Sequence, residues 1–133
     1  MRIEVRSQSR EEMIDITRDV AAAVSGSGVD TGYALVYCPH TTAGLTINEA
    51  ADPDVRADIL AGLSRLAPRE GGWRHAEGNA DAHIKASLMG ASVLVPVRRG
   101  ELVLGTWQGI FFCEFDGPRR RSVDVTVMPS GDS

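Results

Sequence analysis

The sequence predicts an α+β fold, a compact two-layer domain in which helices pack on a mainly antiparallel sheet. Two observations support this. Segments with helical spacing of apolar residues stand between strand-like segments in the first two thirds of the chain, and several apolar runs separated by turn residues follow. A chain of 133 residues is long enough to bury one core. We therefore expect a single domain over residues 1–129 and a short C-terminal tail over residues 130–133.

Composition narrows the classes of function. Hydrophobic residues make up 43% and charged residues 24%, which is ordinary for a globular protein, and the net charge of -4 argues against a nucleic-acid partner. No apolar run resembles a signal peptide or approaches the roughly 18 residues of a membrane-spanning helix. Cys38 and Cys113 lack metal or redox spacing. The composition thus predicts a cytoplasmic protein with reduced, packed thiols and no membrane association.

The N-terminal segment predicts a strand followed by a helix. Residues 2–6 alternate charged and apolar side chains, as a half-buried strand does. Ser9 and Glu12 have the spacing of a capping box, and apolar residues then recur at steps of three and four. We expect a helix that begins here and is ended by Gly26 and Gly28.

A buried strand at residues 32–38 delivers three polar residues at its carboxyl end: His40, Thr41 and Thr42. Imidazole and hydroxyl groups in this position can contact an anion or another ligand. Threonines in a turn can equally well bond to the backbone. The sequence leaves both interpretations open.

A second short apolar run, residues 45–47, is followed by a strong helix start. Asp52 has the position of an N-cap and Pro53 that of the first helical residue. Helical spacing continues until Pro68, and a loop rich in glycine and charge follows over residues 69–79.

The next segment carries the densest set of polar side chains in the chain. A helix is expected from Ala80 with Asn79 as its N-cap, and Asp81 in the first turn suits the helix dipole. His83 and Ser87 share a narrow polar stripe. Two apolar sides flank this stripe, one with Ala82, Ala86 and Met89 and the other with Ile84 and Leu88. We expect both sides to be buried, so that His83 needs a backbone, metal or substrate partner.

Four apolar runs complete the chain, at residues 92–97, 102–106, 108–115 and 123–127. Turn-forming residues separate the first run from the second and the third from the fourth. We expect these runs to form an antiparallel meander.

The three histidines suggest a metal or anion site. All three stand beside polar residues, where their imidazoles can converge, and three acids lie near them in sequence. The candidate set is His40, His75 and His83 with Glu49, Glu77 or Asp81. Zinc or another borderline divalent ion suits such ligands best and Mg²⁺ suits them less well, although no spacing matches a zinc signature.

Two further features have competing interpretations. Residues 119–121 are three arginines after a proline turn, which either clamp a phosphate or form a solvated basic turn. Trp107 follows Gly105 and Thr106 at a strand end, where an indole either stacks on a planar ring or joins the core.

The motifs closely resemble those of the YjbQ-like family. The matching stretches lie in the family order and cover nearly the whole chain. They are the His-Thr-Thr-Ala-Gly-Leu-Thr-Ile-Asn-Glu segment of residues 40–49, Ala-Asp-Pro-Asp-Val of residues 51–55, Asp-Ala-His-Ile-Lys-Ala-Ser-Leu of residues 81–88 and Leu-Gly-Thr-Trp-Gln-Gly-Ile of residues 104–110. The Gly-Thr-Trp-Gln motif is specific to the family.

The resemblance implies a compact α+β fold, a homotrimer, a metal ion near the shared histidines and activity as a secondary thiamine-phosphate synthase. This reaction couples a pyrimidine pyrophosphate to a thiazole phosphate and releases pyrophosphate. The resemblance assigns His40, Glu49, Asp81 and His83 to the polar site as catalytic residues and matches His75 to a family histidine.

We expect His40, His75 and His83 to hold the metal, with zinc preferred over magnesium. Substrate contacts are expected from the remaining polar or stacking side chains: Thr41, Thr42, Asn79, Lys85, Ser87, Trp107 and Arg119. Two alternatives remain, a metal-dependent hydrolase of a phosphorylated small molecule and a non-catalytic trimer that binds a metal or metabolite. In a trimer, neighbouring chains can share the site.

Overall fold

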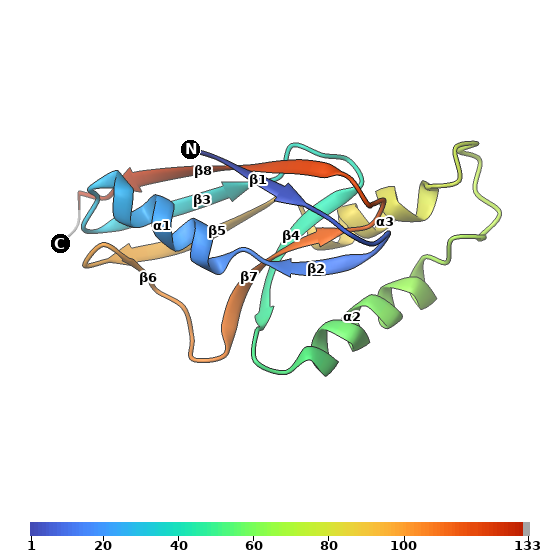
Figure 1. The fold of residues 1–133 in the computed structure, drawn as a ribbon, viewed down its shortest axis with the longest axis horizontal. Coiled ribbons are helices and arrows are strands. Elements are labelled where there is room, and N and C mark those ends of the chain that lie inside the picture. Colours follow the sequence, from blue (N-terminus) through green and yellow to red (C-terminus); the bar gives the residue numbers. More distant parts are fainter. Residues whose placement is uncertain (132–133) are drawn as a thin grey trace.

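A computed structural model describes residues 1–131 of the chain (Figure 1). The described part contains three helices and eight strands. In chain order these are β1 (Arg2–Arg6), β2 (Glu12–Asp15), α1 (Thr17–Ser27), β3 (Gly32–Tyr37), β4 (Ala43–Glu49), α2 (Pro53–Leu66), α3 (Ala80–Met89), β5 (Ser92–Arg98), β6 (Glu101–Leu102), β7 (Gln108–Glu114) and β8 (Arg120–Pro129). Residues 132 and 133 of the expected tail lie outside the described residues.

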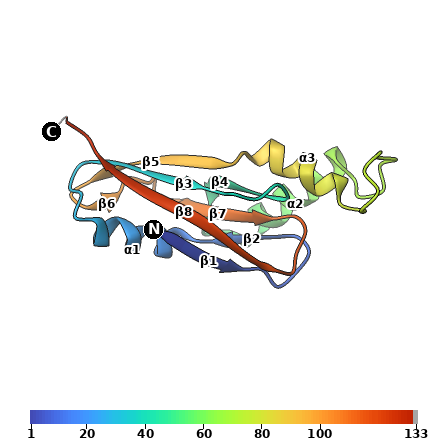
Figure 2. The same ribbon diagram turned by 90° about the horizontal axis from the view of Figure 1, so that it is seen from above.

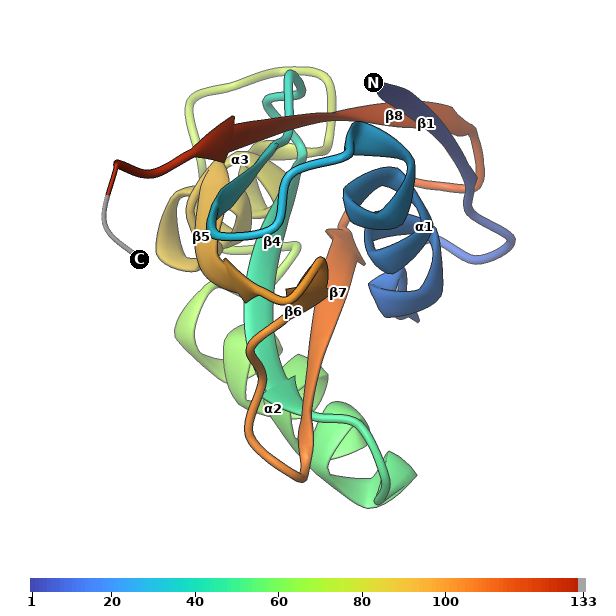
Figure 3. The ribbon, with the colours of Figure 1, turned by 90° about the vertical axis from the view of Figure 1, so that its left-hand side faces the viewer.

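The strands form two antiparallel sheets, which confirms the α+β fold class. Five strands pair in the order β1-β8-β3-β5-β6 and three in the order β2-β7-β4. Figure 2 shows α3 continuing from one end of the layer that contains β5 and β3, and Figure 3 shows α1 packed inside the curve of the sheets. None of the described helices is long and apolar enough to span a membrane.

Strand β7 divides the interior into two apolar clusters. Ile110 and Phe112 join a cluster with α1 and the five-stranded sheet, whereas Phe111 and Cys113 join a cluster with α2 and α3. The alternation of side chains along a strand places these pairs on opposite faces. Both faces of β7 are thus buried, one towards α1 and the other towards α2 and α3.

The predicted start of the first helix is wrong. Residues Glu12–Asp15 pair with β7, and α1 begins at Thr17. The Glu12 carboxylate accepts the backbone N–H of Gln8 instead of capping a helix, and the Asp15 carboxylate accepts both the N–H and the hydroxyl of Thr17. Pairing with the central strand outweighs the local capping pattern. By contrast, the predicted start of α2 is confirmed, because Asp52 accepts the N–H of Asp54 with Pro53 at the first turn.

The predicted meander is also wrong. The hairpin between β5 and β6 exists, but β7 belongs to the other sheet and β8 lies between β1 and β3. The run at residues 102–106 contributes only Leu102 to a strand, since the Gln108 side chain accepts the N–H of Gly105 and closes a turn there. Apolar content alone therefore did not distinguish a strand from this structured loop.

Helix α3 begins at Ala80 as predicted, but its packing differs from the prediction. The side chain of Asn79 makes no capping hydrogen bond, and Leu88 is 54% exposed. The buried side consists of Asp81, Ala82, Lys85 and Ala86. The helix is thus buried on one side only, and that side includes two charged residues.

Candidate functional site

His40 lies where three surface hollows meet. Its Nε2 is 3.0 Å from both the backbone N and O of Ser122, which fixes the ring and leaves Nδ1 for a ligand in either tautomer. Burial, followed by the nearby charge of Arg121, lowers the pKa of His40 below its usual value. The imidazole is therefore neutral at pH 7 and can exchange a proton.

The most polar of these hollows lies between His40 and His83 and has a volume of about 420 Å³. We call it the histidine hollow. Its lining consists of Pro39, His40, Thr41, Thr42, Glu77, Asn79, His83, Asp116, Arg119 and Arg121. A neighbouring hollow of about 550 Å³ shares His40, Thr41 and His83 and adds Ser87. The two hollows together offer space for a ligand with a ring and an anionic group.

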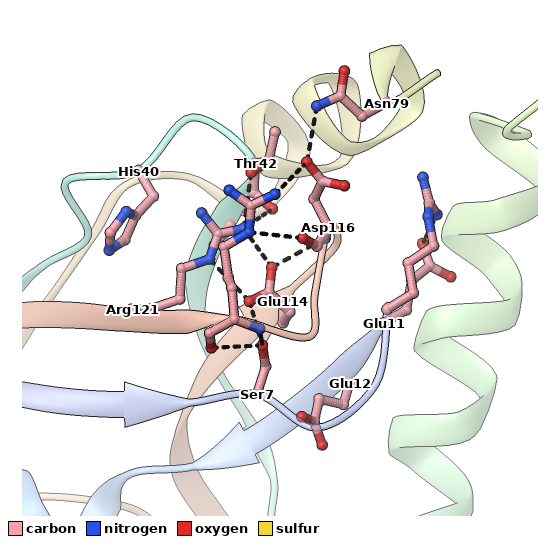
Figure 4. Close-up of polar contacts among 12 residues, drawn as sticks. Ser7, Glu11, Glu12, His40, Thr42, Asn79, Glu114, Asp116 and Arg121 are labelled. Carbon is pink, nitrogen blue, oxygen red and sulfur yellow. Dashed lines mark hydrogen bonds and ion pairs between the residues drawn. The ribbon is translucent and has the colours of Figure 1, made fainter. Parts of the chain in front are cut away.

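A buried ion pair supports the base of the histidine hollow (Figure 4). Arg121 donates from Nε to Glu114 at 2.9 Å and from Nη2 to the Thr42 hydroxyl at 2.8 Å, and the Ser7 hydroxyl donates to Glu114 at 2.7 Å. Burial alone raises the pKa of Glu114, but the hydrogen bonds from Arg121 and Ser7 outweigh it and hold the pKa below its usual value. The pair is thus charged at pH 7 and holds Thr42 in place.

A second buried network fixes α3. Asp81 accepts from Lys85 at 2.9 Å and from Arg10 at 3.1 Å, and Lys85 also donates to Glu11 at 2.6 Å. Burial by itself raises the pKa of Asp81. The hydrogen bonds and charges of Arg10 and Lys85 together outweigh this effect and hold the pKa below its usual value, so the carboxylate stays charged. Neither Asp81 nor Lys85 lines the histidine hollow. Their contacts orient the helix that carries His83.

Asn79, Asp116 and Arg119 form the rim of the histidine hollow. Asn79 Nδ2 donates to Asp116 Oδ2 at 2.8 Å, and Arg119 donates to the same oxygen at 3.1 Å (Figure 4 shows the first two side chains). Asn79 Oδ1 is buried and has no hydrogen-bond partner among the described residues. A buried acceptor without a donor is unfavourable by roughly 1–3 kcal/mol.

His75 and His83 contact each other edge to face, with ring centroids 5.3 Å apart, and His75 Nε2 is 3.6 Å from Glu77. His40 is engaged by Ser122 instead. The described residues include no group of three or more histidine, cysteine or acidic side chains that could hold a metal ion. Within the described part of one chain, the three histidines are therefore not brought together as one ligand set.

The structure separates the candidate residues into three groups. His40, Thr41, Thr42, Asn79, His83 and Arg119 share the histidine hollow, with Ser87 beside it and His75 against His83. Asp81 and Lys85 lie buried beneath α3. Glu49 and Trp107 lie at the opposite end of β4, where the Glu49 carboxylate accepts the N–H of Ala51.

Sequence reasoning missed Glu114, Arg10 and Glu11. Glu114 is the one acid within the apolar run of β7, and an acid in a buried strand is expected to be paired, so the sequence could have indicated this residue. Arg10 and Glu11 gave no such sign, because their partners Asp81 and Lys85 are about 70 residues away in sequence. Cys113 is no candidate nucleophile, since burial raises its pKa to about 12.

The comparisons with known proteins agree with the resemblance in the motifs. Residues 1–130 match the model of the UPF0047 protein YjbQ-like family. The chain is 54% identical over 127 residues to UPF0047 protein YugU of Bacillus subtilis, covering 95% of this chain and 96% of that protein. It is 46% identical over 130 residues to a UPF0047 protein of Archaeoglobus fulgidus, covering 96% and 100%.

Solved structures agree as well. A crystal structure of an uncharacterised protein of the yjbq/upf0047 family from Clostridium acetobutylicum has a TM-score of 0.95 and 53% identity, covering 96% of this chain and 99% of that one. A protein of unknown function from Sulfolobus solfataricus has a TM-score of 0.94 at 36% identity, covering 98% and 96%. None of these names states an activity.

Proposed function

Because the chain belongs to the YjbQ-like UPF0047 family, whose matched members are named without an activity, we propose a function from its own site. The chain acts as a secondary thiamine-phosphate synthase in the cytoplasm. It couples a pyrimidine pyrophosphate to a thiazole phosphate in the histidine hollow. The observation that carries this proposal is the meeting of two imidazoles, two threonines and the Arg119 guanidinium around one open hollow.

The reaction needs stabilisation of a leaving anion. The carbon–oxygen bond to pyrophosphate breaks while the thiazole nitrogen forms a bond to the same carbon, and the electron pair leaves with pyrophosphate. Arg119 is half exposed on the rim and can donate to this anion, while His83 can donate to a phosphate oxygen. Arg121 contributes less, because it is buried and paired with Glu114, whereas the ion pair of Arg119 with Asp116 is at the exposed rim.

The rim supports recognition of the pyrimidine. Asn79 lines the hollow with its amide fixed by the bond to Asp116, so it can limit how the ring is placed. Thr41 is exposed in the same lining, so its hydroxyl is free to turn towards the substrate. The neutral His40 is suited to accept or hold a proton during the coupling.

Product analysis tests this proposal. The purified protein is incubated with the pyrimidine pyrophosphate and the thiazole phosphate, with and without zinc or magnesium. We expect thiamine phosphate and pyrophosphate in equal amounts. Release of orthophosphate without coupling would instead indicate a hydrolase, and binding without turnover would indicate a non-catalytic binding protein; either result overturns the proposal.

A further inference from the structure

Trp107 is an exposed aromatic side chain on a tightly held loop. The residue is 65% exposed, yet its carbonyl accepts the N–H of Ala50 at 2.8 Å. Gln108 closes the same loop, since its side chain accepts the N–H of Gly105 at 2.8 Å and its own N–H donates to the Gly105 carbonyl at 3.1 Å. A large aromatic side chain presented by a fixed backbone is typical of the anchors that fill pockets in protein interfaces.

The chain's own histidine hollow is out of reach of this indole. Strand β4 separates the two, with Ala43 next to the hollow and Glu49 paired with Gln108 at the other end. A seven-residue strand spans roughly 20 Å at about 3.3 Å per residue. Figure 1 shows the loop between β6 and β7 projecting below the body of the molecule, away from α3.

An uncovered apolar surface begins beside the histidine hollow. Leu88 on α3 is 54% exposed, and the outer face of the five-stranded sheet continues from it with Tyr37, Leu94, Tyr33 and Met128. Leu35 pairs with Leu94, and Tyr33 pairs with Met128, so these side chains form one face. Helix α1 packs on the opposite face, against Val36 and Ala34. An apolar face of this extent is typical of an interaction surface.

Charge favours a second copy of this chain as the occupant. Exposed or half-exposed acids surround the Trp107 loop, on β2, the end of β4 and the start of α2: Asp15, Glu49, Asp52 and Asp54. Three exposed arginines stand at the histidine end: Arg2 on β1, Arg119 just before β8 and Arg120 on β8. Arg119 and Arg120 form ion pairs with Asp116 and Glu4 at the exposed surface. Exposed ion pairs contribute little to stability, so these arginines can exchange their partners for the acids of a second copy in a head-to-tail contact.

We propose that Trp107 of a neighbouring copy completes the histidine hollow, so that the substrate site is formed by two chains. The contact joins two different surfaces, and such a contact closes into a ring when its rotation permits. The expected homotrimer is one such ring. The indole supplies the stacking face for the pyrimidine, and only this ligand assignment rests on the proposed function.

Photo-crosslinking tests the shared site without any substrate. Trp107 is replaced by p-benzoylphenylalanine in the full-length chain. An equal mixture of ¹⁵N-labelled and unlabelled protein is irradiated, so that crosslinks between chains can be told from crosslinks within one chain. Mass spectrometry then maps the crosslinked peptides. We expect crosslinks between chains that end in residues 38–43 or 79–91. The matched control carries the same group at Leu66, which is 73% exposed at the end of α2 and should give no crosslink to these peptides.

Crosslinks only within one chain, or between chains but elsewhere, would overturn the shared site. The outcome is independent of activity. If the expected crosslinks form while no thiamine phosphate is made, the shared site stands and the proposed function fails. If thiamine phosphate is made without these crosslinks, the proposed function stands and the shared site fails.

Discussion

Replacing Arg121 by methionine is expected to destabilise the protein by about 3–5 kcal/mol, because it leaves the fully buried Glu114 carboxylate without its cation. The side chain of Arg121 is only 4% exposed, so solvent cannot take over its role. The free energy of unfolding, measured by urea titration at pH 7, checks this value. The matched control is Arg120→Met, whose ion pair with Glu4 is exposed on both sides and should contribute less than about 1 kcal/mol.

The pH dependence separates charge from packing in this experiment. In the wild type the pKa of Glu114 lies below its usual 4.5, so the stability it contributes is present above pH 4.5 and is lost as the pH falls below it. Without Arg121, burial raises this pKa, and protonation then relieves the penalty. The loss in the free energy of unfolding caused by Arg121→Met should therefore become smaller as the pH falls from 7 to 5. Adding Glu114→Gln should recover part of the stability at pH 7, and a deficit unchanged by either condition would show that lost packing is the cause.

Replacing His83 by alanine is expected to lower kcat for thiamine phosphate formation by roughly 10²–10³-fold, the range for losing one hydrogen-bond donor to a developing anion. His83 lines both hollows at the centre of the proposed site, whereas Asp81 and Lys85 on the same helix hold the fold. Steady-state kinetics measures the loss, with circular dichroism and size-exclusion chromatography to confirm an intact fold and assembly.

His75→Ala is the matched control for this prediction. Its imidazole contacts His83 but does not line the histidine hollow. We expect a much smaller change in kcat than for His83→Ala. An equal loss of kcat in both variants would indicate that the two histidines act together. Full activity of His83→Ala would show that His83 has no role in the reaction.

Sequence patterns predicted the features that depend on local chemistry. The N-cap at Asp52 with Pro53 behind it, the start of α3 at Ala80 and the hairpin after β5 all follow from neighbouring residues, and the structure contains each. The motif resemblance identified the family, which the family model confirms. The grouping of His40, Thr41 and Thr42 at a strand end was also readable, because the strand that carries them is plain in the sequence.

The remaining features depend on pairing between distant segments. Glu12–Asp15 became a strand because β7 is its partner, about 100 residues later. Asp81 belongs to the family motif and Lys85 has a charge suited to pyrophosphate, which is why both were expected at the site. Their buried partners Arg10 and Glu11 lie about 70 residues away in sequence. Glu49 and Trp107 stand in motifs next to the site in sequence, and the length of β4 keeps them apart within one chain.

Calorimetric titration with inorganic pyrophosphate tests the central claim most directly, that the histidine hollow receives a pyrophosphate-bearing substrate. We predict binding at one site per chain in the wild type, at least tenfold weaker binding in Arg119→Ala and in His83→Ala, and unchanged binding in Arg120→Met, whose guanidinium lies outside this hollow. No binding to the wild type, or equal binding by all four proteins, would contradict the account and place the ligand elsewhere.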